Sequence, residues 1–262
     1  MLSDVGRLAD HQTRLTSARS ARPFWLATPA VFQPASEILI FLYIQRAVEM
    51  AIRAGEPARA AQWEANEALR ATVVGEPRAL ELAQRVLQLN PGHDATYVAA
   101  LAFANLGDAR RARELSQQLN RQFPLDTLVQ ESELLTIQAV IDFRQGFPTR
   151  AIETLKRASQ YELRYADHFA LQPVYVRGEA YLKAAQGQQA AAEFQKMLAH
   201  HGIVGNSITG ALAHLQLGRA QAMMGDKTAA RKSYQDFLAI WKDADPDIPI
   251  YRQAKAEYAL LR

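Results

Sequence analysis

The stretch Gly205-Asn206-Ser207-Ile208-Thr209-Gly210 is the part of this sequence whose spacing comes nearest to a phosphate-binding loop. Such a loop needs a Lys followed by Ser or Thr directly after its last glycine, because the ammonium group holds the phosphate. Ala211 and Leu212 stand there instead. A nucleophile elbow is excluded as well, since it needs glycine two residues after the serine. We therefore interpret the stretch as a loop that caps a following helix.

Histidine and carboxylate residues give no recognisable metal or acid–base site. His200 and His201 are adjacent in the sequence, and neighbouring residues on a helix point about 100° apart, so the two imidazoles would rarely bind one ion. Glu131, Glu133 and Glu162 have arginines nearby and are predicted to lie on solvated helix faces. The sequence contains no cysteine, which excludes disulfides and thiolate ligands. We predict no catalytic, cofactor-binding or metal-binding residue, and we expect that the chain is not an enzyme.

Charge and hydropathy restrict the partners further. The 262 residues carry a formal net charge of +3, and the arginines form no block, so direct binding to nucleic acid is not expected. The longest apolar run covers residues 38–44, well short of the roughly 20 residues that cross a membrane. The N-terminus lacks an early apolar stretch followed by a small-residue cleavage site. We therefore expect neither a membrane span nor a signal peptide.

A regular spacing of small residues dominates the rest of the chain. Four alanines are separated by 39, 39 and 40 residues: Ala112, Ala151, Ala190 and Ala230. Twelve residues before each of them stands another tiny residue: Ala100, Ala139, Gly178 and Gly218. Bulky apolar residues follow three of them at a distance of four: Leu155, Phe194 and Tyr234. A fixed period near 40 residues indicates a repeat protein in which each unit packs on its neighbours.

Turn residues divide the chain into segments of helical length. Gly107-Asp108 and Gly225-Asp226 place glycine after one helix and an N-capping Asp before the next. Apolar residues recur at steps of three and four between such breaks, as they do on one face of a helix. The expected helices cover 36–54, 57–74, 76–90, 94–106, 108–121, 128–145, 148–161, 168–186, 188–200, 207–224, 226–242 and 248–261.

These patterns resemble the tetratricopeptide repeat, a helix–turn–helix unit of about 34 residues. LGRAQAMMGDKTAARKSYQDFL (217–238) and RGEAYLKAAQGQQAAAEFQKML (177–198) carry the small residue, glycine, alanine and aromatic of that signature. The copy that starts at Tyr97 is similar, whereas the copy near 139–158 has Asp142 where an aromatic is usual. The resemblance implies an all-α, right-handed superhelix of about five to six helix pairs, closed by a C-terminal capping helix over 248–261.

A second resemblance concerns the C-terminal stretches PVYVRGEAYL and YQDFLAIWKDADPDIPIYRQAKAEYALL. They look like repeats in the C-terminal region of bacterial eukaryotic-type serine/threonine protein kinases or winged-helix regulators. The resemblance covers about 45–262, which we treat as one helical repeat domain. Residues 1–44 do not share it and are expected to be an atypical, poorly ordered segment. A cytoplasmic location is expected, or a periplasmic one if the chain derives from a membrane-anchored kinase.

The same resemblance implies that the first helix of each pair lines a concave groove. The inward positions with side chains suited to a peptide are Tyr97, Asn105, Phe143, Arg144, Tyr175, Glu179, Lys183 and Arg219. Their aromatic and basic character suits a protein or peptide with acidic or apolar side chains. Packing between repeats explains several of them equally well. The function expected is therefore a noncatalytic protein–protein interaction scaffold in bacterial signalling. One alternative is a fragment of a serine/threonine kinase that lacks its catalytic domain. Another is self-association through the exposed groove or through the N-terminal apolar surface around residues 38–44.

Overall fold

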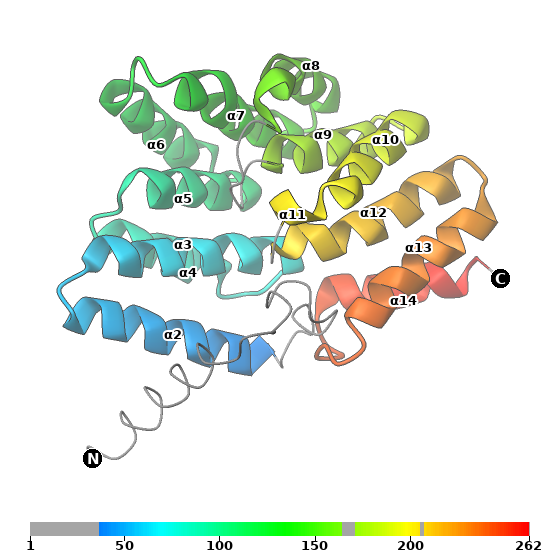
Figure 1. The fold of residues 1–262 in the computed structure, drawn as a ribbon, viewed down its shortest axis with the longest axis horizontal. Helices are drawn as coiled ribbons and strands as arrows, with labels where there is room; N and C mark the ends of the chain where they lie inside the picture. Colours follow the sequence, from blue (N-terminus) through cyan, green and yellow to red (C-terminus); the bar gives the residue numbers. More distant parts are fainter. Residues whose placement is uncertain (1–36, 164–170, 205–206, 262) are drawn as a thin grey trace, which may run out of the picture. The chain divides into compact units, whose positions relative to one another are not determined.

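The computed structural model describes residues 37–163, 171–204 and 207–261, with the backbone alone for 37–41, and all of them belong to one compact unit. Thirteen α-helices and no strand occur in these ranges (Figure 1). The helices are α2 (Glu37–Arg53), α3 (Pro57–Val74), α4 (Ala79–Gln88), α5 (His93–Asn105), α6 (Ala109–Gln122), α7 (Leu134–Arg144), α8 (Pro148–Ala158), α9 (Gln172–Lys183), α10 (Gly187–Ala199), α11 (His201–Val204), α12 (Ile208–Met223), α13 (Lys227–Ile240) and α14 (Pro249–Ala259). The all-α prediction is confirmed for this part of the chain.

The helices pack in neighbouring pairs that follow one another along the sequence. The pairs are α3–α4, α5–α6, α7–α8, α9–α10 and α12–α13. The first helices of successive pairs also touch, so that α5 lies between α3 and α7, and α9 lies between α7 and α12 (Figure 1). At the ends of the series, α2 packs on α3 and α14 packs on α13.

Helix ends follow the capping residues found in the sequence. Asp108 accepts a hydrogen bond from the backbone N–H of Arg111 at 3.0 Å, and Asp226 accepts one from Ala229 at 2.9 Å. Both aspartates therefore act as the predicted N-caps of α6 and α13. Gly107 and Gly225, one residue earlier, have φ of 82° and 81°, the left-handed geometry in which glycine commonly ends a helix.

Three predicted helices differ from the observed ones near one end. The predicted 128–145 helix starts with a π-helical turn, η3 (Val129–Glu133), and the predicted 148–161 helix ends in a 3₁₀ turn, η4 (Ser159–Tyr161). Helix α4 starts at Ala79 rather than at 76, because residues 77–78 form a turn before it, and Glu76 pairs with Arg70 and Arg78. Most of the predicted segment 1–44, and residues 168–170 of the predicted 168–186 helix, lie outside the described residues. Helix α2 is continuous across residues 44 and 45.

The repeated small residues mark the closest helix crossings. All four periodic alanines are fully buried: Ala112, Ala151, Ala190 and Ala230. A Cβ atom added to Gly178 would lie 2.6 Å from Cζ of Phe194, and one added to Gly218 would lie 2.8 Å from Cδ2 of Tyr234. Glycine is thus required at these two crossings because the aromatic ring from the second helix occupies the space of a side chain.

The buried side chains form two large clusters that meet at α9. The first extends over α3–α8 and is rich in alanine, and we call it the alanine core. The second extends over α9–α14, includes Val74 at the end of α3 and is rich in aromatic residues, and we call it the aromatic core. Val174 and Tyr175 of α9 belong to the aromatic core, whereas Val176 and Ala180 belong to the alanine core. Helix α9 is therefore the boundary on which both parts of the array depend.

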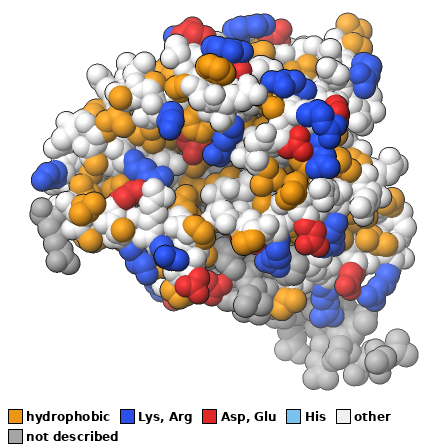
Figure 2. All heavy atoms as spheres, turned by 180° about the vertical axis from the view of Figure 1, so that it is seen from behind, with side chains coloured by type: hydrophobic (Ala, Val, Ile, Leu, Met, Phe, Trp, Pro, Cys, Tyr) orange, Lys and Arg blue, Asp and Glu red, His pale blue; other side chains and the backbone are white. Residues whose placement is uncertain are grey.

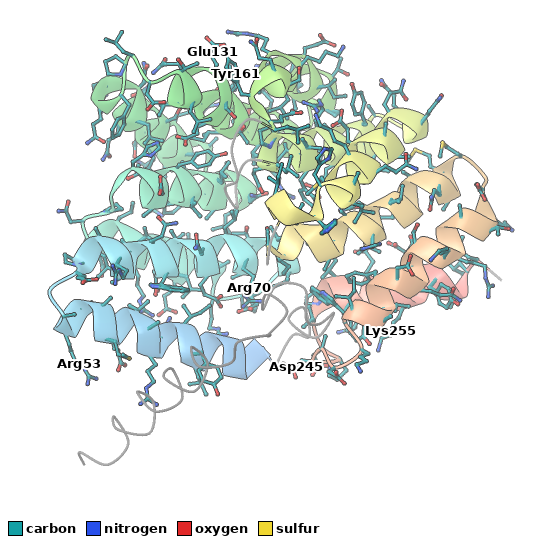
Figure 3. All side chains as sticks on the ribbon, viewed as in Figure 1. Arg53, Arg70, Glu131, Tyr161, Asp245 and Lys255 are labelled. Carbon is teal, nitrogen blue, oxygen red and sulfur yellow. The ribbon has the colours of Figure 1, made fainter. Side chains whose placement is uncertain are left out.

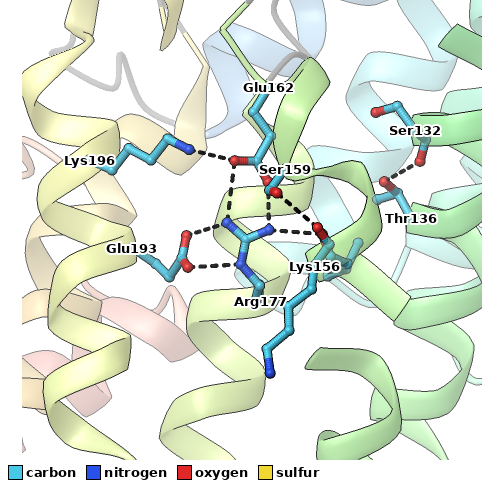
Figure 4. A network of polar contacts seen from close by, with 9 residues as sticks. Ser132, Thr136, Lys156, Ser159, Glu162, Arg177, Glu193 and Lys196 are labelled. Carbon is cyan, nitrogen blue, oxygen red and sulfur yellow. Dashed lines mark hydrogen bonds and ion pairs between the residues drawn. The ribbon is translucent and has the colours of Figure 1, made fainter. Parts of the chain in front are cut away.

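A buried ionic cluster fixes this boundary (Figure 4). The guanidinium of Arg177 donates to Glu162 at 2.5 Å, to Glu193 at 2.6 and 2.8 Å, and to the backbone oxygen of Leu155 at 3.0 Å. Lys196 also donates to Glu162, at 2.5 Å. Arg177 is 4% exposed and Glu162 1%. The prediction that Glu162 lies on a solvated face is therefore wrong, because its partners come from helices that only the fold brings together.

Candidate interaction surface on the first helices

The eight groove positions predicted from the sequence all lie on first helices, but their exposure differs along each helix. Tyr97 and Tyr175, in the first half of α5 and α9, are 4% and 2% exposed. Arg144 and Lys183, in the last turn of α7 and α9, are exposed. The surface accessible to a partner is thus near the C-terminal ends of the first helices. The two tyrosines pack inside the array, as the packing interpretation of these positions predicts.

Two of the eight residues contact each other between neighbouring pairs. Arg144 donates to the side-chain oxygen of Asn105 through Nη2 at 2.6 Å and through Nε at 3.2 Å. The two residues are 39 positions apart, which is the spacing of the periodic alanines. The guanidinium of Arg144 also lies 5.4 Å from the ring centre of the partly buried Phe143. These contacts orient Arg144 along the surface while leaving it accessible.

A second group of polar side chains joins α9 to α12 and α14. Gln216 donates to Tyr175 at 3.3 Å and to Glu179 at 3.1 Å, and it accepts from Arg219 at 3.2 Å. Arg219 in turn donates to both carboxylate oxygens of Glu257, at 2.9 and 3.0 Å. Arg219 therefore holds the C-terminal helix, and its guanidinium is already engaged within the chain.

Glu179 is the acidic member of the surface. Burial raises the pKa of its carboxyl group, and the neighbouring guanidinium groups of Arg144 and Arg219 act in the opposite direction. The carboxylate thus lies between two cations that both come from neighbouring pairs. Lys183 is one turn further along α9, and its side chain is exposed. Arg144 and Lys183 are therefore the two cations among the eight positions that solvent reaches most readily.

A contact between His93 and Glu133 was not predicted from the sequence. The imidazole Nε2 of His93 lies 2.8 Å from Glu133, Nδ1 lies 2.8 Å from Asp94, and the ring packs on Phe123 with centroids 4.8 Å apart. The hydrogen bond with Glu133 raises the pKa of His93 to about 9. Glu133 is 6% exposed, so its predicted place on a solvated face is wrong. The signal in the sequence was the spacing of 40 residues between the two, close to the repeat period.

Asp142, which replaces the usual aromatic of the repeat, is also buried. Its Oδ1 lies 3.0 Å from Nη2 of Arg150, and the Arg150 guanidinium lies over the ring of Phe147 at 5.0 Å. An ion pair and a cation–aromatic contact therefore occupy the position where the resemblance leads one to expect a ring.

The sequence motifs considered above as possible chemical sites have structural roles in the part of the chain that the structure describes. Ser207 caps α12 by accepting from the backbone N–H of Thr209 at 3.4 Å, whereas Gly205 and Asn206 lie outside the described residues. His200 lies 2.8 Å from the backbone oxygen of Lys196 through Nδ1. No group of three or more potential metal ligands occurs in the described ranges. Within the same ranges, no helix is both long and apolar enough to cross a bilayer.

Basic side chains are spread among acidic ones on one face of the molecule. On the face shown in Figure 2, red carboxylates lie between blue Lys and Arg side chains, with apolar patches among them. This face has no continuous basic stripe of the kind that binds a nucleic-acid backbone.

Comparison with known proteins finds a similarity to a bacterial transcription activator. The chain is 24% identical over 185 residues to the transcription activator GutR of Bacillus subtilis. The matched region is 67% of this chain and 22% of GutR, so the chain spans about a fifth of that protein. No protein-family model matches the sequence.

Proposed function

We propose that this chain is a noncatalytic docking region of a bacterial regulator, built as a tetratricopeptide-like α-solenoid. The paired helices support this architecture, as do side-chain contacts between pairs at spacings of 37 to 41 residues. In a solenoid, each unit contacts only its neighbours and the first helices share one face. That face is where we place the partner.

The observation that carries the proposal is the pair of exposed cations at corresponding places in successive units. Arg144 and Lys183 are both exposed, both in the last turn of a first helix, and 39 residues apart (183−144). Asn105 and Phe143 orient the first of them. An extended segment that crosses α7 and α9 would meet the two cations in turn. We therefore propose an acidic segment of a protein as the ligand.

The similarity to GutR favours one of the two groups that the C-terminal stretches resemble. GutR is named a transcription activator, which agrees with a winged-helix regulator rather than with a kinase. We propose on this basis that the partner belongs to transcriptional control. Because the match covers only 22% of GutR, the proposal concerns the docking region and not an activity of a whole regulator.

A charge-reversal pair tests the docking surface. The partner is first identified by crosslinking in native extract, and its affinity for the purified chain is then measured by calorimetry. Arg144→Glu with Lys183→Glu should weaken binding at least tenfold, or about 1.4 kcal/mol. The matched control is Arg113→Glu with Lys242→Glu, two exposed cations on second helices or after them, which should keep the affinity. Equal affinities for both double variants would rule out this surface.

A phosphotransfer assay separates the proposal from the kinase alternative. The purified chain, incubated with ATP and Mg²⁺ together with a general acceptor protein, should produce no phosphoprotein. Transfer that survives further purification would contradict a noncatalytic role, whatever the outcome of the binding experiment.

A further inference from the structure

The first helices α5, α7, α9 and α12 all end in the same way. In each, one C-cap residue follows the helix, and the next residue has left-handed backbone geometry, with φ of 82°, 87°, 57° and 81°: Gly107, Gly146, Ala185 and Gly225. The last residues of the four helices therefore occupy equivalent places. They are 39, 39 and 40 residues apart, like the periodic alanines, and we call them the end row: Asn105, Arg144, Lys183 and Met223.

The end row changes from cationic to apolar along its length. Arg144 and Lys183 are exposed, and Arg144 bonds to the neutral amide of Asn105, so its charge stays available to a partner. Met223 is 46% exposed, and a Cβ atom added to Gly187 at the start of α10 would lie 3.4 Å from its Cγ atom. Met223 thus leans toward the turn that follows Lys183. A half-exposed methionine offers a partner an adaptable apolar contact.

The spacing of the first helices favours one conformation of the ligand. Packed helices lie about 8–10 Å apart, and the first helices of successive pairs touch. A polyproline II helix has three residues per turn and rises about 3.1 Å per residue, so side chains on one side of it recur about every 9 Å. We infer, on the basis of the proposed docking function, that the partner's segment is a polyproline II helix. It carries an acidic residue for Arg144, another three positions away for Lys183, and a large apolar residue three positions further for Met223.

An extended strand fits the same row less well. Its side chains on one side recur at every second residue, about 6.6 Å apart, so they fall out of step with the helices after one contact. A polyproline II segment also keeps its backbone solvated, so recognition depends on side chains and the pattern suits either chain direction. Even counting Glu179, one turn before Lys183, the cations of α7 and α9 outnumber the carboxylate, so an acidic segment is favoured.

Labelled synthetic peptides and the full chain test the pattern by fluorescence anisotropy. Two peptides carry it, Glu-x-x-Glu-x-x-Leu and the reverse Leu-x-x-Glu-x-x-Glu, where x is Pro or Ala. Two others have the same composition with the three side chains at every second position. We expect one peptide of the first kind to bind about fivefold tighter, or more, than either of the second kind. Equal affinities for the two spacings, or no binding up to about 1 mM, would overturn the inference.

Variants of the chain assign the individual contacts. Lys183→Gln should abolish the preference for the wider spacing, whereas Arg53→Gln should keep it, because Arg53 is exposed at the end of α2, outside the end row (Figure 3). Met223→Gln should weaken the leucine peptide about fivefold, because part of the methionine side chain leaves water on binding, and should not affect a peptide with alanine in that place. Leu125→Gln, at a side chain that is 94% exposed after α6, is the matched control. Equal losses for the leucine and alanine peptides would contradict the apolar contact.

Failure of the pattern and failure of the docking surface can be told apart. If the Arg144→Glu/Lys183→Glu pair weakens binding of the natural partner but the peptides do not respond to spacing, the surface is right and the polyproline II pattern is wrong. If that pair leaves the partner's affinity unchanged, the surface itself is wrong and the inference falls with it.

Discussion

The alanine core and the aromatic core solve the same packing problem with different side chains. The alanine core buries fifteen alanines and two aromatic residues, whereas the aromatic core buries seven alanines and six aromatics. The difference shows that the repeat spacing does not dictate side-chain size. It dictates that one helix at each crossing carries a small residue and that the other fills whatever space remains.

The comparison is clearest at two equivalent crossings. At the crossing of α7 and α8, the small residue of the first helix is Ala139 and the bulky residue of the second helix is Leu155. Both are fully buried. Between α9 and α10, 39 residues later, the same positions are held by Gly178 and Phe194, with the ring where a Cβ would be. The pairs are complementary within each crossing, so exchanging one member alone should create a clash or a cavity.

The largest effect is expected where the two cores meet, at Arg177. Arg177→Met removes the guanidinium that neutralises the buried Glu162 and leaves that carboxylate with Lys196 alone. Breaking a buried ion pair from one side costs about 3–5 kcal/mol, because a desolvated charge remains. We therefore expect the free energy of unfolding, measured in guanidinium by circular dichroism, to fall by about this amount.

Two further variants show whether charge is the cause. Adding Glu162→Gln to Arg177→Met removes the stranded charge and should recover part of the loss. Arg157→Met, at a side chain that is 66% exposed, should change stability by less than about 0.5 kcal/mol. A double variant no more stable than Arg177→Met would mean that lost packing, rather than the buried carboxylate, accounts for the effect.

A smaller effect is expected from Gly178→Ala, which breaks the complementarity of one crossing. Helix propensity alone would stabilise the variant by up to about 1 kcal/mol, since alanine replaces a mid-helix glycine. The new Cβ would lie 2.6 Å from the Phe194 ring, and overpacking of this kind costs about 1–3 kcal/mol. We expect a net loss in thermal or guanidinium unfolding.

The double variant Gly178→Ala/Phe194→Leu copies the α7–α8 crossing onto α9–α10. It should be more stable than Gly178→Ala alone, because leucine lacks the ring atoms that meet the new Cβ. In the other direction, Leu155→Phe should be destabilising and Ala139→Gly should partly relieve it. If the single changes simply add in both crossings, the side chains are not coupled as the comparison implies.

The periodic residues explain why the fold was largely predictable from the sequence. Local signals set the helices: Pro57 and Gly75 bound α3 at the predicted 57–74, and Asp108 and Asp226 cap as expected. Contacts between helices were harder to foresee. The burial of Glu162 depends on Arg177 and Lys196, 15 and 34 residues away, and no local pattern distinguishes it from a solvated glutamate. The exposure of the candidate surface also depends on position along each first helix, which periodicity does not describe.

The smallest expected effect is a dependence of stability on pH that differs between the two cores. His93 ties α5 to the π-helical turn before α7, in the alanine core, while the corresponding region of the aromatic core uses the neutral contact between Tyr175 and Gln216. The pKa of His93 is raised to about 9, above its ordinary value near 6.5, so the folded state holds the proton more tightly than the unfolded state. This contribution is complete below pH 6.5 and is lost as the pH rises through about 9. The wild-type chain should therefore lose stability between these values, by about 1 kcal/mol for a partly exposed pair.

Two histidine variants and an exchange experiment decide whether His93 is the cause. His93→Gln should flatten the decline, since glutamine does not titrate. His214→Gln is the matched control and should leave the decline in place: burial lowers the pKa of His214, so its titration cannot make the folded state less stable as the pH rises. Amide exchange, corrected for the intrinsic effect of pH, should speed up in α5 and η3 while α12 and α13 keep their protection. Equal loosening of both cores at pH 9 would mean that the decline is a general effect of charge and not the release of one contact.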